Sequence, residues 1–393
     1  MDALHAHRDY VARGRLSADL LREPVFRAWE RSHLLHADPL RLKADHLDER
    51  DTERLLDRER WLIAASQPYM VALSRAAGNE RHAAMLGDAE GFVLDVLGDE
   101  ESVHGPTSVP GPGSLLTEAV AGANGIGTPL AEGGYVELVG PEHFIEGFHP
   151  FTCQGIPIHD PESRVIGSIS TSVRRPEAGR RIREILLCAA HGIEAELLRG
   201  RLEEDVRRVL ASGGMDEGLI EKLRQDVVQA QTGARLQVET AARGLSRNRF
   251  EGAMRILQLA ERSIDSFRRQ SALWHNLVSG ETGASRPIGL DLIVRDLVEL
   301  LATEAATGAI DLVVGDLEPA TIEADPRAVA RTLFGCFLRA FDAARGGGAV
   351  QVAVRKHAGL GAEVLLTPVP PMGSARPVGP VRLVLPLAGG VAQ

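Results

Sequence analysis

Short apolar runs bounded by turn residues fill the middle of the N-terminal half of the chain. They lie at 82–87 and 92–98, on either side of an Asp/Gly turn, and at 135–139, 152–158 and 165–173. Runs of this length between Gly, Pro, Asn and Asp are typical of β-strands joined by hairpins. The pattern therefore predicts an α+β sandwich of sensor-domain size, with several antiparallel strands and helices on one side.

Helical spacing of apolar residues precedes these strands. It runs through Leu20–Trp29 and again through Leu55–Ile63, and Pro39 and Pro68 punctuate it. We interpret 26–39 as an amphipathic helix whose Trp29 docks on the next domain, with a functional role for Arg31 or His33 as the alternative. A further helix is expected near Ser114, capped by that serine, with Glu118 in its first turns.

A longer helical pattern follows the strands. Apolar residues recur at three- and four-residue steps among Arg and Glu: Ile182, Ile185, Leu186, Ala189, Ile193, Leu197, Leu202, Val206 and Val209. This spacing is typical of a coiled-coil seam. Because a single exposed stripe needs a partner, it predicts a parallel homodimer. Two further amphipathic stretches, 216–243 and 250–277, predict a helical hairpin that forms a four-helix bundle in the dimer.

Composition narrows the class of protein. A length of 393 residues favours two or three domains, and a formal net charge of −10 is dispersed along the expected helices. We therefore expect no membrane and no direct nucleic-acid partner, and the 4% aromatic content argues against a base-stacking surface. The cysteines, at 153, 188 and 336, lack paired spacing, which fits a reducing compartment, and no apolar leader or span occurs. The cytoplasm is the expected location.

The stretch 113–161 has the composition of a pocket wall, with a Gly-rich turn, small-residue loop and two apolar strands. Candidate ligand contacts are Asn124, Glu142, His143, Phe144, Phe151 and Cys153. For Asn124 the alternative is bonding to the backbone of its own loop, and Glu142 and His143 could equally fix a loop. Cys153 is interpreted as a small buried filler rather than a redox thiol. No metal-ligand spacing is present and no cofactor is expected.

These residues resemble a known family. The segments 29–32 with 38–39, Gly122–Thr128, 142–144, 152–153 and 157–161 are similar to the amino-terminal GAF sensor region of the acetoin catabolism regulator group, over about residues 20–205. Proteins of that group are enhancer-binding activators of the alternative sigma factor. Ala123 and Gly125 stand where the family has Thr and Ala, and Leu116 where Trp is usual. These departures alter the pocket's hydrogen bonds and volume, so the resemblance leaves the ligand open.

The C-terminal half, about 215–388, resembles the dimerisation and ATP-binding halves of histidine kinases. Segment 322–333 is similar to the strand-turn-helix that leads into their nucleotide site, and 348–354 and 381–387 to the strands after it. Gly335 and Arg339 occupy the positions of the family's magnesium-binding asparagines, and neither side chain can serve that ion. Segment 366–373 lacks the adenine-reading Asp, the lid is reduced to 377–380, and the first hairpin helix has no histidine. His275 is interpreted as a surface or interface residue without an acidic neighbour.

Together these patterns predict five segments: a helical arm (1–78), a GAF sensor domain (79–178), a signalling helix (179–212), a dimerisation hairpin (213–284) and a degenerate kinase-like ATPase domain (285–393). The hypothesis is a homodimeric cytoplasmic sensor that binds a small metabolite and acts on a histidine kinase or response regulator. Alternatives are an active divergent kinase, a transcription regulator and an enzyme of the pocket. Against the last two, we find no Walker P-loop motif, no helix-turn-helix and no nucleophile–base–acid set.

Overall fold

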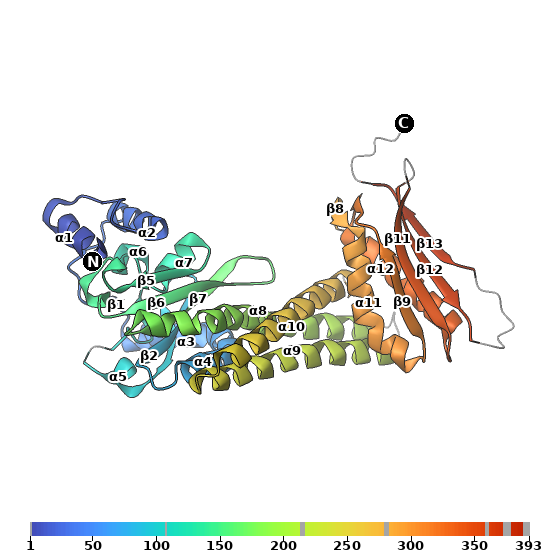
Figure 1. Cartoon of the computed structure of the whole chain (residues 1–393), viewed down its shortest axis with the longest axis horizontal. Coiled ribbons are helices and arrows are strands. Elements are labelled where there is room, and N and C mark those ends of the chain that lie inside the picture. The colour runs from blue at the N-terminus through green and yellow to red at the C-terminus, as the bar shows by residue number, and fades with distance from the viewer. Residues whose placement is uncertain are drawn as a thin grey trace. The chain divides into compact units, whose positions relative to one another are not determined.

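The computed structural model describes residues 2–106, 108–212, 217–278, 283–357, 361–371 and 379–387. The chain is α+β and divides into two compact units, one of residues 1–198 with 231–264 and the other of 199–230 with 265–393. Each unit has its own sheet (Figure 1). Among the described residues, no helix combines the length and apolar character needed to cross a membrane.

The sheet of the first unit confirms the predicted strands. Its order is β3-β2-β7-β6-β5, and each neighbouring pair is antiparallel. Since the strands alternate their side chains between two faces, β7 directs Ser168, Ser170 and Ser172 to one face and Ile169 and Thr171 to the other. The bounds are β2 His82–Asp88, β3 Val93–Gly98, β5 Val136–Val139, β6 Thr152–His159 and β7 Val165–Val173.

Helices of the N-terminal arm and of the sheet's connections complete this unit. Pro68 was expected to punctuate the helical pattern, but it lies inside α4, whose buried Tyr69, Met70 and Leu73 outweigh the lost backbone hydrogen bond. Trp29 of α2 is buried, as predicted. The bounds are α1 Asp2–Arg13, α2 Glu23–Leu34, α3 Glu49–Arg58, α4 Arg60–Ala77, α5 Glu100–His104, α6 Glu118–Ala121 and α7 Gly127–Glu132, with 3₁₀ turns η1 Gly140–Glu142 and η2 Glu146–Phe148.

The expected Ser114 cap is wrong. Ser114 lies in β4 (Ser114–Leu115), which pairs with β1 (Asp45–His46), and α6 begins only after Thr117. Ser114 pairs with His46 in the register of this ribbon. A tertiary contact with a segment some 70 residues away, invisible in the local pattern, therefore replaces the helix start.

Three long helices follow: α8 Pro176–Ser212, α9 Glu217–Ser246 and α10 Phe250–Val278. The expectation of an exposed seam on α8 is wrong for its first half, because Ile182, Ile185 and Ile193 are buried within the chain itself. Gly192 admits the Tyr69 ring of α4, since a Cβ there would lie 2.2 Å from Tyr69 Cε1. The side chains of Val206 and Val209 lie outside the described residues.

The second unit has a four-stranded sheet of order β13-β12-β11-β9, with β9 parallel to β11 and the remaining pairs antiparallel. Helix α12 packs on β11 and β12 through a face that includes Phe337 and Phe341. The sequence pattern missed β12. The bounds are β8 Arg286–Gly289, α11 Leu290–Thr307, β9 Asp311–Leu317, β10 Thr321–Ala324, α12 Pro326–Ala344, β11 Ala349–His357, β12 Gly361–Val369 and β13 Val381–Leu385.

Candidate functional site

A small cavity lies between the sheet of the first unit and the loop that precedes α7. Its volume is about 20 Å³, and one water molecule needs roughly 10–15 Å³, so the cavity has room for a single water molecule. An organic ligand therefore has to displace side chains to enter it. The lining is mostly apolar: Met85, Val109, Pro110, Leu116, Asn124, Gly125, Phe148, Phe151, Cys153 and Ser172.

One edge of this cavity is polar. Cys153 and Ser172 stand directly opposite each other in the β6–β7 register, and Cys153 Sγ lies 3.1 Å from Ser172 Oγ. Burial raises the pKa of the Cys153 thiol to about 12, so the thiol stays protonated at neutral pH. This supports the interpretation of Cys153 as a buried filler. The hydroxyl and thiol can hydrogen-bond a neutral group on an occupant of the cavity.

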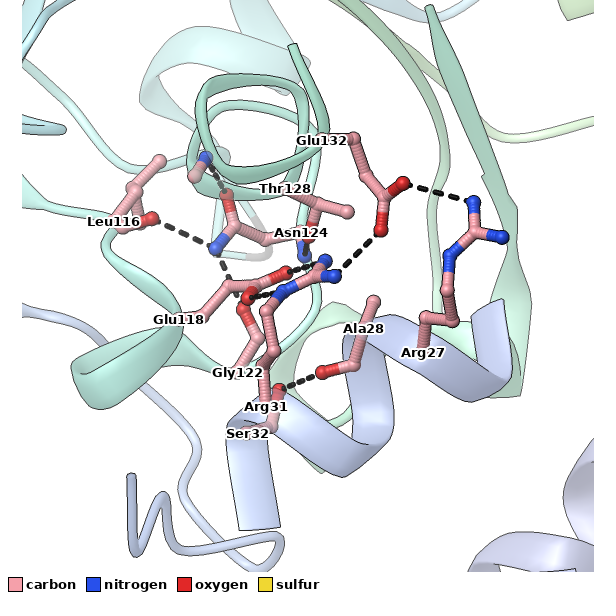
Figure 2. A network of polar contacts seen from close by, with 11 residues as sticks. Arg27, Ala28, Arg31, Ser32, Leu116, Glu118, Gly122, Asn124, Thr128 and Glu132 are labelled. Atoms are coloured by element: carbon pink, nitrogen blue, oxygen red, sulfur yellow. Dashed lines mark hydrogen bonds and ion pairs between the residues drawn. The ribbon is translucent and has the colours of Figure 1, made fainter. Parts of the chain in front are cut away.

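Asn124 organises the loop that closes the cavity (Figure 2). Its Nδ2 donates to the carbonyls of Leu116 and Gly122, both at 2.8 Å. Its Oδ1 accepts from the amides of Ile126 at 2.9 Å and Gly127 at 2.8 Å. Because both ends of the side-chain amide are hydrogen-bonded to backbone, Asn124 holds its own loop in shape, which is the alternative role given for it in the sequence analysis. Asn124 also lines the cavity.

Gly125 lets this loop lie directly on the sheet. A Cβ at this position would lie 2.5 Å from Ser170 Oγ and 2.9 Å from Cys153 Cβ, which is closer than real Cβ contacts. The Ala found at this place in the acetoin regulator group therefore does not fit unless both Ser170 and Cys153 move.

Glu142 lies away from the cavity and holds a turn. Its carboxylate accepts from Arg22 Nε and from the amide of Val139, both at 2.8 Å, and its carbonyl accepts from Trp29 Nε1 at 2.8 Å. The carbonyl contact ties the N-terminal arm to the turn after β5. We assign Glu142 a structural role.

Phe144 and His143 also belong to the packing around the cavity rather than to its lining. Phe144 is fully buried and lies edge-on to Trp29 and Tyr10, with ring centroids 5.2 Å apart in each pair. His143 is fully buried too, and its Nδ1 lies 2.9 Å from the carbonyl of Gly140. Of the predicted contacts, the structure thus brings Asn124, Phe151 and Cys153 together around the cavity.

Acidification is expected to weaken the first unit through His143. Burial lowers its pKa in the folded chain to about 4, whereas the unfolded chain protonates near 6.5. The unfolded state binds the proton first, so stability falls by up to about 1.4 kcal/mol per pH unit as the pH decreases from 6.5 towards 4. Urea unfolding measured across this range should show a shallower acid dependence in His143→Asn, whose amide can still donate to Gly140.

The matched control for this pH series is His36→Asn. His36 is exposed and has a φ of 60°, a conformation that Asn adopts readily. This control should keep the acid slope of the parent chain. An unchanged slope in His143→Asn would contradict the assignment.

An ion-pair cluster fastens the arm to the loop (Figure 2). Arg31 Nε and Nη2 donate to the Glu118 carboxylate at 2.6 and 3.0 Å, and Arg31 Nη1 donates to Glu132 at 2.6 Å. The Glu118 side chain is only 3% exposed. Arg27 reaches the other oxygen of Glu132 at 2.9 Å. Arg31, considered above for a functional role, therefore joins α2 to α6 and α7.

Met85, Phe148 and Ser172 were missed as lining residues by the sequence analysis. Ser172 alternates with Ile169, Thr171 and Val173 along β7, and this alternation was the available signal for a polar residue facing the loop. Met85 and Phe148 carry no local signal, because apolar residues are expected throughout a core. Met85 reaches the cavity from β2 and Phe148 from the 3₁₀ turn η2, so their placement depends on the tertiary fold.

The degenerate nucleotide positions lie on α12 in the second unit. A Cβ at Gly335 would meet nothing within 4 Å, and Arg339 Nη2 donates to Cys336 Sγ at 3.2 Å.

The prediction that His275 lacks an acidic neighbour is wrong. Its Nδ1 lies 2.9 Å from Oδ2 of Asp205, a residue of α8. Residues 372–378, which include part of the adenine-loop and lid segments, lie outside the described residues. Within the described ranges, no group of three His, Cys, Asp or Glu residues could hold a metal ion.

Comparison with known proteins relates the chain to regulators of transcription. The propane 2-monooxygenase operon transcriptional activator MimR of Mycolicibacterium smegmatis is 28% identical over 313 residues, which are 73% of this chain and 52% of that protein. The signal-transduction and transcriptional-control protein of Clostridium beijerinckii is 28% identical over 144 residues, 36% of this chain and 23% of that protein. The chain spans about half the length of the MimR relative, and less of the other.

A solved structure of the Escherichia coli DhaR(N)–DhaL complex contains a chain that is 16% identical, with a TM-score of 0.46, and the match covers 50% of this chain and 69% of that one. A family model described as MimR, N-terminal domain, matches residues 1–195. That range contains the arm, the five-stranded sheet, the cavity and the first part of α8. The N-terminal half of the chain is thus similar to the N-terminal domain of MimR.

Proposed function

We propose that this chain is a cytoplasmic signal-transduction regulator that binds a small neutral metabolite in the cavity beside Asn124. The observation that carries this proposal is the cavity itself, which lies within the range that matches the MimR N-terminal domain. Relatives named as transcriptional activators support a role in transcription control. In this function residues 79–178 act as a GAF-type sensor domain.

The chemistry of the lining defines the class of ligand. Arg31, Glu118 and Glu142 are engaged with one another or with other protein groups outside the cavity, so no ionised side chain is found among the described residues that line it. A charged ligand would lose its hydration without gaining a counter-ion, at a cost of several kcal/mol. The Cys153–Ser172 edge can bind one hydroxyl or carbonyl oxygen. Small alcohols, ketones and aldehydes satisfy both conditions.

Ligand binding is tested by thermal unfolding in acetone, propan-2-ol and propanal. At least one of them should raise the melting temperature, and Ser172→Ala should weaken its binding about tenfold through loss of a hydrogen bond worth about 1.4 kcal/mol. Ser168→Ala is the matched control, because Ser168 shares the strand face but donates to the carbonyl of Ile126 at 3.2 Å. Equal binding by both variants would contradict the assignment of Ser172.

For the second unit we propose a catalytically inactive kinase-like module that acts through protein contacts. Gly335 and Arg339 support this, since neither offers an oxygen ligand for magnesium. The output would be delivered by a homodimer to a histidine kinase or response regulator. Incubation with labelled ATP and magnesium should leave the chain unlabelled, and stoichiometric autophosphorylation would favour the active-kinase alternative.

A further inference from the structure

A second and much larger hollow lies elsewhere in the first unit. Its volume is about 370 Å³, within the roughly 300–1,000 Å³ typical of small-molecule sites. It is formed where three segments meet: the end of α4 with residues 78–80, the end of β7 with the first turns of α8, and the turn between α9 and α10. No lining residue is shared with the cavity beside Asn124.

Apolar side chains form one wall of this hollow, which we call the hinge pocket. Val173, Ala178, Ile182 and Leu245 are buried there, and the Phe250 ring lies at its edge. The backbone of Gly78 lies beside Ser246, and a Cβ on Gly78 would be in ordinary van der Waals contact with the Ser246 carbonyl oxygen, at 3.7 Å. Gly78 has a φ of +64°, so the turn after α4 uses the left-handed region that favours glycine.

The hinge pocket is lined by two arginines, Arg175 and Arg181, and by one carboxylate, Glu80. Glu80 lines the pocket and is held by Arg175, whose Nε lies 3.1 Å from Glu80 Oε2. The hydrogen bond from Arg175 and, to a smaller extent, the nearby charge of Arg181 lower the pKa of Glu80. Arg181 itself makes no hydrogen bond or ion pair within the described part of the chain, and its guanidinium carbon lies 5.5 Å from the centre of the Phe250 ring. Stacking on a ring holds a guanidinium in place while its N–H groups stay available.

Amide side chains complete the polar half. Asn79 and Asn248 both line the hinge pocket and are exposed to solvent. Each offers two N–H donors and a carbonyl acceptor. The pocket thus combines a guanidinium beside an aromatic ring, two exposed amides, the Glu80–Arg175 pair and an apolar wall, and such a mixture of polar groups and apolar surface suits a small polar metabolite.

We infer that the hinge pocket binds a small organic oxyanion, a carboxylate or phosphate ester, whose anionic group pairs with Arg181 and whose body lies against Val173, Ile182 and Leu245. A planar guanidinium binds such an anion through paired N–H donors. Because the occupant touches α4, α8 and the α9–α10 turn at once, it braces the end of the helical hairpin. This site is independent of the proposed neutral ligand.

Titration calorimetry with succinate, inorganic phosphate and the neutral butane-1,4-diol tests this inference on the full chain. Sodium chloride is kept at matched ionic strength, because salt screens exposed charges. An oxyanion should bind and the diol should not, and preference for succinate or phosphate decides between the two sources of the anion. Arg181→Gln should weaken binding at least tenfold, and Arg181→Lys should recover part of it.

Arg180→Gln is the matched control. Arg180 is the neighbouring arginine on α8, is exposed, and pairs with Glu177 at 3.4 Å outside the pocket lining. Its loss should leave binding unchanged. Absence of heat with both anions, equal binding of the diol, or equal weakening by Arg180→Gln and Arg181→Gln would overturn the inference. Ser172→Ala should have no effect on anion binding, which separates this outcome from the test of the neutral cavity.

Discussion

Replacing Asn124 with Ala is expected to destabilise the first unit by about 4 kcal/mol or more. The side chain is 1% exposed, and its loss leaves the carbonyls of Leu116 and Gly122 and the amides of Ile126 and Gly127 without their partner. A buried backbone group without a hydrogen bond costs about 1–3 kcal/mol, and a water molecule can satisfy some of the four. Urea unfolding followed by circular dichroism measures the change.

The control for this substitution is Asn79→Ala. Asn79 is exposed in the turn after α4, so the same change in side chain should alter stability by less than about 0.5 kcal/mol. Because the chain contains two units, the transition that shifts must be identified. Hydrogen exchange of the amides in 122–128 should increase in Asn124→Ala. A loss below about 1 kcal/mol would mean that the loop is held by its contacts with the sheet instead.

Replacing Arg31 with Ala is expected to cost about 3 kcal/mol. The Glu118 carboxylate, with a side chain 3% exposed, would remain buried without its bidentate partner, and breaking such a pair from one side costs about 3–5 kcal/mol. We expect the lower end of that range because the Arg31 side chain is 30% exposed and water can reach its place. Faster hydrogen exchange in α2 should accompany the loss.

Arg27→Ala supplies the matched control one turn earlier on the same helix. The Arg27 side chain is 45% exposed and pairs with Glu23 and Glu132, so water screens its ion pairs and its removal should cost much less stability than the removal of Arg31. Combining Arg31→Ala with Glu118→Gln removes the unpaired charge and should restore part of the stability. A double variant as unstable as the sum of its parts would show that the two side chains act separately.

The strands of the first unit could be predicted from the sequence because each is a short apolar run between turn residues. Trp29 could also be assigned to an interface, since a large aromatic residue on an amphipathic helix needs a partner surface. Local pattern was sufficient in both cases. For Asn124 the structure shows the alternative interpretation, since the side chain is hydrogen-bonded to its own loop, and the residue also lines the cavity. Its contact with a ligand stays a prediction.

The remaining features depend on contacts between distant segments. Ser114 pairs with a strand near residue 46, and the first half of the stripe on α8, at Ile182, Ile185 and Ile193, is covered by other parts of the same chain. A period of three and four residues shows that a helix face is buried but not what covers it. Likewise, the acid beside His275 comes from another helix, so no neighbouring residue in the sequence indicates it.

The attachment of the arm sets a limit on where the chain can be shortened. A truncation that begins at residue 79, at the expected start of the sensor domain, removes Tyr10 and Trp29 and uncovers the Phe144 ring that they enclose. It also leaves Glu118 without Arg31. A newly exposed apolar surface favours aggregation. A shortened sensor domain therefore has to retain residues 1–34, because helices α1 and α2 form part of its core.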